Sequence, residues 1–199
     1  MSPRRPEPPA DRPREESTDP ETAVRSILLR RLSHAPRTRA ELEKDLVRRG
    51  ADPEVSAQVL DRFEEVGLID DASYARMWVE SRHRGKALAR SVLKQELRQR
   101  GVDAEFIDDA IEHIDDDAEY QRAREFAERK ARVKPGEDLA KAMSRLAGQL
   151  ARKGYPAGVC FSVSKEVLGP LLQQWQDHVV DEVDTSVIVD NFSEHQESV

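Results

Sequence analysis

The chain carries a run of basic residues of the kind that contacts phosphate groups or an acidic protein surface. Its members are Arg82, Arg84, Lys86, Arg90, Lys94 and Arg98. Three of them, Arg90, Lys94 and Arg98, recur at i,i+4 spacing and flank an apolar face carrying Leu93 and Leu97. We predict that these six residues form the contact surface. An ordinary solvated helix face is the alternative, because charges also cover the outer side of most amphipathic helices.

Other residue types that could do chemistry are scattered. The sequence has five separate histidines and one cysteine, Cys160, which we interpret as a packing residue. Asp70-Asp71 and Asp115–Asp117 have the positions of helix caps, and no histidine or glutamate at helical spacing completes a metal site. No nucleophile–base, zinc-protease or phosphate-loop motif is present. We therefore expect no catalysis, no cofactor and no metal.

Two further patterns leave alternatives open. Basic residues precede three glycines: Arg48-Arg49, Arg98 with Arg100, and Arg152-Lys153. The interpretation we prefer is that they complement the helix dipole, and this is compatible with a shared basic ridge that binds a ligand. Tyr74 and Trp78 share one helix face. Stacking on nucleic-acid bases is one role for them, and packing in the core is the interpretation we prefer.

Composition predicts an all-α fold for the 199 residues. Charged residues make up 36% and aromatic residues 5%, and the common types are those that lose little side-chain freedom in a helix. One cysteine, no apolar stretch long enough to cross a membrane and no signal peptide favour a reducing, cytoplasmic location. We expect a monomer that does not bind membranes.

The net charge of −7 arises from one end of the chain. Residues 170–199 contain seven acidic residues and no lysine or arginine. We predict a largely mobile acidic tail over 171–199 and, because prolines are frequent there, a disordered arm over 1–20.

An internal repeat lies between arm and tail. Gly50, Gly101 and Gly154 are 51 and 53 residues apart, and each is preceded by two leucines at i,i+4 spacing and followed by apolar residues five and nine positions on. Each glycine suits the left-handed residue that ends a helix. The repeat predicts three tandem three-helix units, over 21–66, 67–114 and 115–170, in an elongated, curved molecule.

Helix-capping patterns agree with these boundaries. Thr38 and Glu41 have the spacing of a capping box, and Asp52-Pro53 and Asp103 fit helix starts after the first two glycines. Pro156 marks the corresponding start in the third unit.

The central unit resembles the RecX family. The resemblance rests on the order of four motifs: Gly67-Leu68-Ile69-Asp70-Asp71 before Tyr74-Ala75, Ser81-Arg82 before Gly85, Glu96-Leu97 before Gly101-Val102, and Leu150 before Lys153-Gly154-Tyr155. It covers roughly Ala23 to Leu168. Many relatives have a second glycine and an isoleucine after the Ser-Arg motif, where this chain reads Lys86-Ala87-Leu88-Ala89 and then Val92.

This resemblance implies a bacterial regulator of the RecA recombinase, acting in homologous recombination, DNA repair and the SOS response. A RecX-type protein lies in the groove of the RecA–DNA filament and reduces ATP hydrolysis, strand exchange and the stimulated self-cleavage of repressor-type partners. Single- or double-stranded DNA is then a second candidate partner. The alternative function is a stand-alone DNA-binding regulator with helix-turn-helix-like units, which requires base-reading side chains along an exposed helix.

Overall fold

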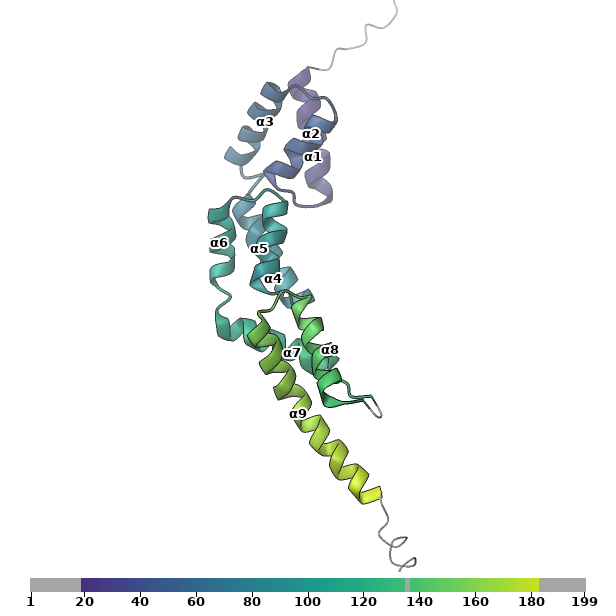
Figure 1. Cartoon of the computed structure of the whole chain (residues 1–199). Helices are drawn as coiled ribbons and strands as arrows, with labels where there is room; N and C mark the ends of the chain where they lie inside the picture. Colours follow the sequence, from purple (N-terminus) through teal and green to yellow (C-terminus); the bar gives the residue numbers. More distant parts are fainter. Residues whose placement is uncertain (1–18, 135–136, 183–199) are drawn as a thin grey trace, which may run out of the picture. The chain divides into compact units, whose positions relative to one another are not determined.

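The computed structural model describes residues 19–134 and 137–182, with the side chains after Leu171 left aside. Within these residues it contains nine α-helices and no strands, which confirms the all-α prediction (Figure 1). The helices are α1 (Pro20–His34), α2 (Arg39–Arg48), α3 (Pro53–Glu65), α4 (Asp71–Lys86), α5 (Arg90–Gln99), α6 (Ala104–Glu112), α7 (Asp116–Lys130), α8 (Leu139–Ala151) and α9 (Ala157–Glu182).

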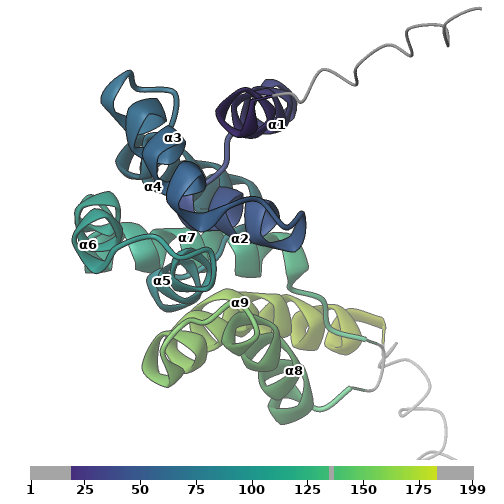
Figure 2. The same cartoon turned by 90° about the horizontal axis from the view of Figure 1, so that it is seen from above.

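The chain forms two compact units. Among the described residues, the first comprises 19–74 together with Arg100–Val102, and the second comprises Ala75–Gln99 with 103–134 and 137–182. In the first unit, α1, α2 and α3 all contact one another. In the second, α5 lies beside α6, and α7, α8 and α9 form a three-helix group in which α8 and α9 run side by side (Figures 1 and 2).

The repeated leucines form the core as the sequence predicts. Each of the six is no more than 2% exposed: Leu42, Leu46, Leu93, Leu97, Leu146 and Leu150. The first unit adds Val24, Leu28 and Phe63 to its core. Small residues such as Ala123 and Ala127 pack against Leu146 and Leu150 in the second. Helical periodicity therefore identified the buried face of every middle helix.

The three repeat glycines end their helices in the left-handed conformation. Their φ angles are +71° at Gly50, +75° at Gly101 and +89° at Gly154. In the first repeat the Gly50 amide donates to the Val47 carbonyl, and the next amide donates to the carbonyl of Leu46. This pattern closes the end of α2 and confirms the predicted role of the glycine.

The predicted caps are partly observed. Asp52 accepts hydrogen bonds from two amides of α3, and Thr38 Oγ1 accepts one from the Glu41 amide at 3.1 Å. The Glu41 carboxylate pairs with Arg100 instead of returning to the Thr38 amide, so the reciprocal half of the box is not observed. Asp103 stands at the start of α6 without a capping hydrogen bond from its side chain.

Both ends of the repeat array differ from expectation. α1 starts at Pro20, capped by Asp19, so helix begins inside the segment assigned to the disordered arm. α9 continues to Glu182, so residues 171–182, which the prediction placed in a largely mobile tail, are helical. Long side chains and the absence of glycine after Gly169 let the helix continue, although the segment lacks basic residues. The rest of both predicted segments lies outside the described residues, and the elongated, curved shape stays a prediction.

The single cysteine lies inside the α8–α9 layer. Cys160 is 4% exposed, and its Sγ lies 3.4 Å from the carbonyl oxygen of Tyr155. Burial raises the pKa of this thiol. This confirms the interpretation of Cys160 as a packing residue.

Candidate functional site

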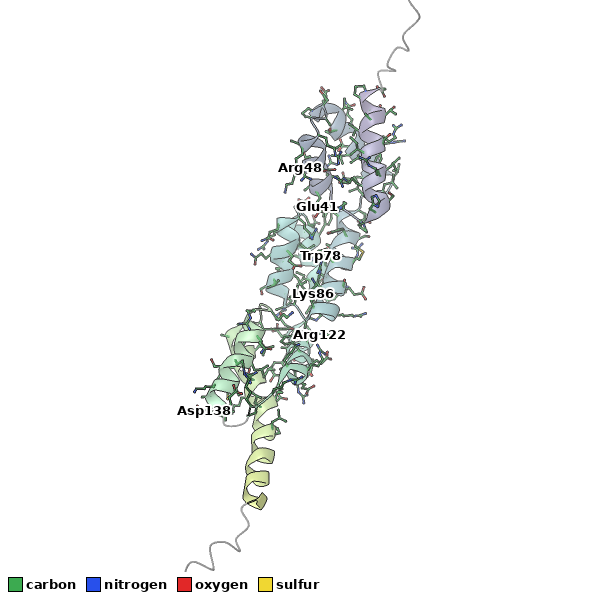
Figure 3. All side chains as sticks on the ribbon, turned by 90° about the vertical axis from the view of Figure 1, so that its right-hand side faces the viewer. Glu41, Arg48, Trp78, Lys86, Arg122 and Asp138 are labelled. Carbon is green, nitrogen blue, oxygen red and sulfur yellow. The ribbon has the colours of Figure 1, made fainter. Side chains whose placement is uncertain are left out.

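An aromatic–cation stack lies on α4. The Arg82 guanidinium lies 4.0 Å from the centroid of the Trp78 ring, and Trp78 Nε1 donates a hydrogen bond of 2.8 Å to Glu96 on α5. Trp78 and Lys86, both on α4, are labelled in Figure 3. The ring is half-buried, whereas Tyr74 is buried, so core packing is confirmed for the tyrosine and only partly for the tryptophan. Arg82 therefore covers an aromatic face while its guanidinium edge remains available to a ligand.

Three of the six predicted contact residues are exposed. Arg84 pairs with Glu80 at 2.8 Å, with 72% and 63% of the two side chains exposed. Lys86 and Arg98 are also exposed, and within the described residues no ion pair or hydrogen bond engages either charged group. An exposed pair contributes little to stability, so these three cations remain free to meet a partner.

Arg90 has a different environment. Its amide donates to Glu119 Oε1 at 2.8 Å, its Nε donates to Glu119 Oε2 at 3.1 Å, and its Nη1 donates to the Ile114 carbonyl at 3.1 Å. Asp116 accepts from the remaining nitrogen, and the Glu119 side chain is only 5% exposed. These donors join α5 to α7, so we interpret Arg90 as a structural residue, and its predicted contact with a partner stays a prediction.

Lys94 also has a partner on another helix, although that partner is exposed. Its ammonium lies 2.7 Å from the Asp108 carboxylate on α6, and this contact holds the pKa of Asp108 below its usual value. Arg90 and Lys94 line a groove whose other charged residues are all acidic: Asp108, Asp109, Glu112 and Asp115. This side of α5 is therefore not a basic surface.

The six residues consequently fall on two sides of the second unit. Trp78, Arg82 and Lys86 follow one another at four-residue intervals along α4, and this row meets α5 through Glu96. Glu96 and Lys94 are two residues apart, which puts them on nearly opposite sides of α5. The sequence grouped these cations because it cannot show which helix each of them faces.

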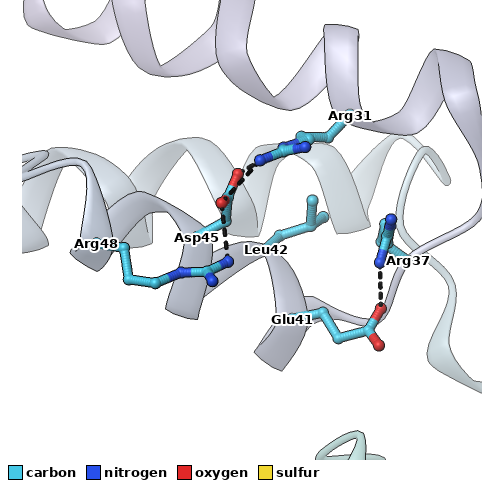
Figure 4. A pocket seen from close by; sticks show the side chains of 6 residues that line it. All are labelled: Arg31, Arg37, Glu41, Leu42, Asp45 and Arg48. Carbon is cyan, nitrogen blue, oxygen red and sulfur yellow. Dashed lines mark hydrogen bonds and ion pairs between the residues drawn. The ribbon is translucent and has the colours of Figure 1, made fainter.

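Sequence reasoning missed an arginine cluster around Asp45 in the first unit. Arg31 donates to this carboxylate at 2.6 Å, Arg48 at 3.0 Å and Arg49 at 3.2 Å. The hydrogen bond from Arg31 outweighs burial and, with Arg49, lowers the pKa of Asp45 to about 2. The cluster borders a pocket of about 120 Å³ that Arg37 and Glu41 also line (Figure 4). The spacing of Asp45 to Arg48 and Arg49 was the available signal.

Several of the basic residues before the glycines have individual partners. Arg49 bonds Asp45 of its own helix, and Arg100 pairs with Glu41. Lys153 donates to the Lys86 carbonyl at 2.9 Å and lies over Phe126. Charge complementarity with the helix dipole remains compatible with all three positions.

The acidic pairs act as helix caps. Asp70 Oδ1 accepts from the Ser73 amide at 2.8 Å, and Asp115 Oδ1 accepts from the Ala118 amide at 2.7 Å. These bonds satisfy free amides at the starts of α4 and α7.

Comparison with known proteins explains the threefold repeat. Family models described as the first, second and third three-helix domains of RecX match residues 25–63, 70–111 and 117–163. The regulatory protein RecX of Streptomyces coelicolor is 47% identical over 150 residues, covering 75% of this chain and 80% of that protein. The chain belongs to the RecX family. RecX of Thermobifida fusca is 45% identical over 145 residues, covering 73% and 78%.

Solved RecX structures have the same fold. The crystal structure of RecX from Lactobacillus salivarius aligns with a TM-score of 0.67 at 21% identity, over 75% of this chain and 97% of the other. All six basic residues fall within the second RecX domain. None of the helices within the described residues is long and apolar enough to span a bilayer.

Proposed function

We propose that this RecX-family chain binds the RecA nucleoprotein filament and lowers RecA activity: ATP hydrolysis, strand exchange and stimulated self-cleavage of repressor-type partners. The observation that carries the proposal is the match of all three RecX domains, in order, over residues 25–163. A binder that contacts neighbouring subunits lowers turnover by favouring one filament state, with no chemistry of its own. A bacterial cytoplasmic location and a monomeric chain complete the proposal.

The exposed cations of the second unit are the proposed contact surface. Arg84 and Lys86 extend into solvent from α4, and Arg82 presents a guanidinium edge above Trp78. Arg98 also extends into solvent, but from the side of α5 that carries Lys94, four residues before it. They suit phosphate groups or acidic side chains, because none of the four is held by a buried carboxylate. Arg90 is assigned to support of the helices instead, because its partner Glu119 is buried. Lys94 pairs with an exposed carboxylate in the acidic groove and is left out of the proposed surface.

The direct test is the single-strand-dependent ATP hydrolysis of RecA with increasing amounts of this protein, at two salt concentrations. We expect inhibition at or below one protein per RecA subunit. Unchanged hydrolysis, together with no binding to the filament, would refute the proposal.

A matched pair of variants tests the contact surface. Arg84→Glu with Lys86→Glu should weaken filament binding about tenfold or more, equivalent to about 1.4 kcal/mol. Arg62→Glu is the control, because Arg62 and Glu65 form a surface pair with exposure of 71% and 64%, close to that of Arg84 and Glu80. Equal affinities for both variants would reject the assignment of these cations.

Binding to duplex DNA in the absence of RecA distinguishes the proposed function from the alternative, a stand-alone DNA-binding regulator. A stand-alone DNA regulator binds duplex strongly, with a steep dependence on salt. We expect weak binding to DNA alone and tight binding only when RecA is present.

A further inference from the structure

Two glycine turns of the repeat dock against the start of a helix in the preceding repeat. In the first unit, Gly101 lies so close to Ala40 on α2 that a Cβ at the glycine would stand 2.4 Å from the alanine Cβ. Thr38, which caps the same helix, donates from Oγ1 to the Arg100 carbonyl at 2.7 Å. Arg100 in turn pairs with Glu41 in the first turn of α2.

The second unit repeats this contact. A Cβ on Gly154 would stand 2.4 Å from Val92 and 2.8 Å from Ser91 Oγ, both in the first turn of α5. The Ala89 amide donates to the Lys153 carbonyl at 2.9 Å, and Ser91 Oγ donates to the Gly154 carbonyl at 2.7 Å. Ala89 immediately precedes α5, and Thr38 immediately precedes α2. Each of the two glycine turns therefore contacts the N-terminal end of a helix.

Within the described residues, the first of the three glycine turns, at Gly50, has no helix start packed against it. Gly50 has a φ of +71°, and no atom of the described residues lies within 4 Å of the position of a Cβ. Within the described residues, the carbonyl oxygens of Gly50 and Arg49 accept no hydrogen bond. Arg49, which corresponds to Arg100 and Lys153, bonds Asp45 on its own helix instead of a preceding repeat.

We propose that the Gly50 turn is a docking site for the first turn of an α-helix from a partner protein. The two occupied turns define the chemistry of that helix. It has a capping residue that donates to the Arg49 carbonyl and a small residue or serine facing the glycine. It also has an acidic side chain that draws Arg49 away from Asp45. The inference rests on the proposed function, which makes the partner a subunit of the RecA filament.

A second copy of this chain does not fit the same contact. Docking in the manner of Gly101 and Gly154 requires a helix that starts three residues before the first repeat leucine, as α2 does before Leu42 and α5 before Leu93. In the third repeat, α8 starts at Leu139, seven residues before Leu146. α8 therefore does not present the same helix start to the Gly50 turn of a second copy.

Gly50→Asn tests the docking site, with Gly67→Asn as its matched control. Both glycines have a φ of +71°, open space at the Cβ position and the same two backbone bonds closing a helix end. Asparagine tolerates this conformation better than other side chains, so both variants should lose similar, small amounts of stability. The two experiments are thermal unfolding and binding to RecA filaments on single-stranded DNA.

We expect Gly50→Asn to bind the filament at least about tenfold more weakly than Gly67→Asn, at equal melting temperatures. Equal affinities for the two variants, with a wild-type chain that binds, would refute the docking site alone. A wild-type chain that does not bind would refute the proposed function and the docking site with it. If the wild-type chain sediments as a dimer that Gly50→Asn separates, the turn binds a second copy and the proposal is overturned.

Discussion

Two groups of basic residues lie on either side of the short connection between α4 and α5, and they differ in what surrounds them. Before it, Arg84 and Lys86 extend into solvent, and the carboxylate that Arg84 meets is itself 63% exposed. After it, Arg90 bonds a carboxylate that is 5% exposed and belongs to another helix. The burial of the partner, more than the charge, therefore separates the proposed contact residues from Arg90, which supports the helices.

Leu97→Ala should have the largest effect, because it removes core packing that supports both groups of basic residues. Leu97 is fully buried on α5, so the free energy of unfolding should fall by about 4 kcal/mol. Urea unfolding followed by circular dichroism measures the loss. A change below about 1 kcal/mol would contradict the observed burial.

Arg90→Glu and Arg84→Glu apply one substitution to each group. Arg90→Glu leaves Glu119 buried beside a second carboxylate, so it should cost about 3 kcal/mol. Arg84→Glu should cost less than about 0.5 kcal/mol and should affect mainly filament binding. Chemical denaturation of both proteins, with filament affinity measured on the same samples, gives the comparison. Equal stabilities would remove the distinction between the two groups.

The Asp45 cluster lies between the two groups in the burial of its carboxylate. Its contribution to stability can be measured by lowering the pH. Because the pKa of Asp45 is lowered to about 2 in the folded protein, its contribution is complete above the unfolded pKa and disappears as the pH falls from about 4 to about 2. We expect about 1 kcal/mol after allowing for solvent screening. The stability advantage of the wild type over Asp45→Asn should therefore shrink between pH 5 and pH 2.5 by about that amount. An advantage that does not change with pH would show that the arginines do not stabilise the ionised carboxylate.

Ala87→Gly changes a residue in the connection between α4 and α5, and it should have the smallest effect on stability. Ala87 has a φ of +50°, and its carbonyl accepts from the Tyr155 hydroxyl at 3.1 Å. Glycine relieves the left-handed strain but loses a buried methyl group and adds freedom to the unfolded chain. We expect a gain of about 0.5 kcal/mol in unfolding free energy with unchanged filament binding. A loss of stability would mean that the methyl contact outweighs the strain.

Most of the fold could be predicted from the sequence because its signals are local. Leucines at i,i+4 spacing and a glycine at each helix end depend on neighbours within one or two turns. The end of α9 was predicted less well, because the loss of basic residues was given more weight than helix propensity. Charge composition does not by itself stop a helix.

The candidate site could be predicted only as a set of residue types. Whether Arg90 faces solvent depends on Glu119, which is 29 residues away, and i,i+4 spacing carries no information about that distance. The link between Trp78 and Glu96 also joins separate helices. Arg48 and Arg49, within one turn of Asp45, had a local signal that pointed to their partner, as did Arg84, one turn after Glu80.

The buried thiol makes the protein a reporter of its own local opening. Cys160 is the only cysteine in the sequence, and it lies in the α8–α9 layer with a raised pKa. Its reaction with a thiol reagent therefore requires that the layer first separates. The rate of modification under native conditions measures how often this happens. The same rate with RecA present would show whether partner binding tightens the third repeat.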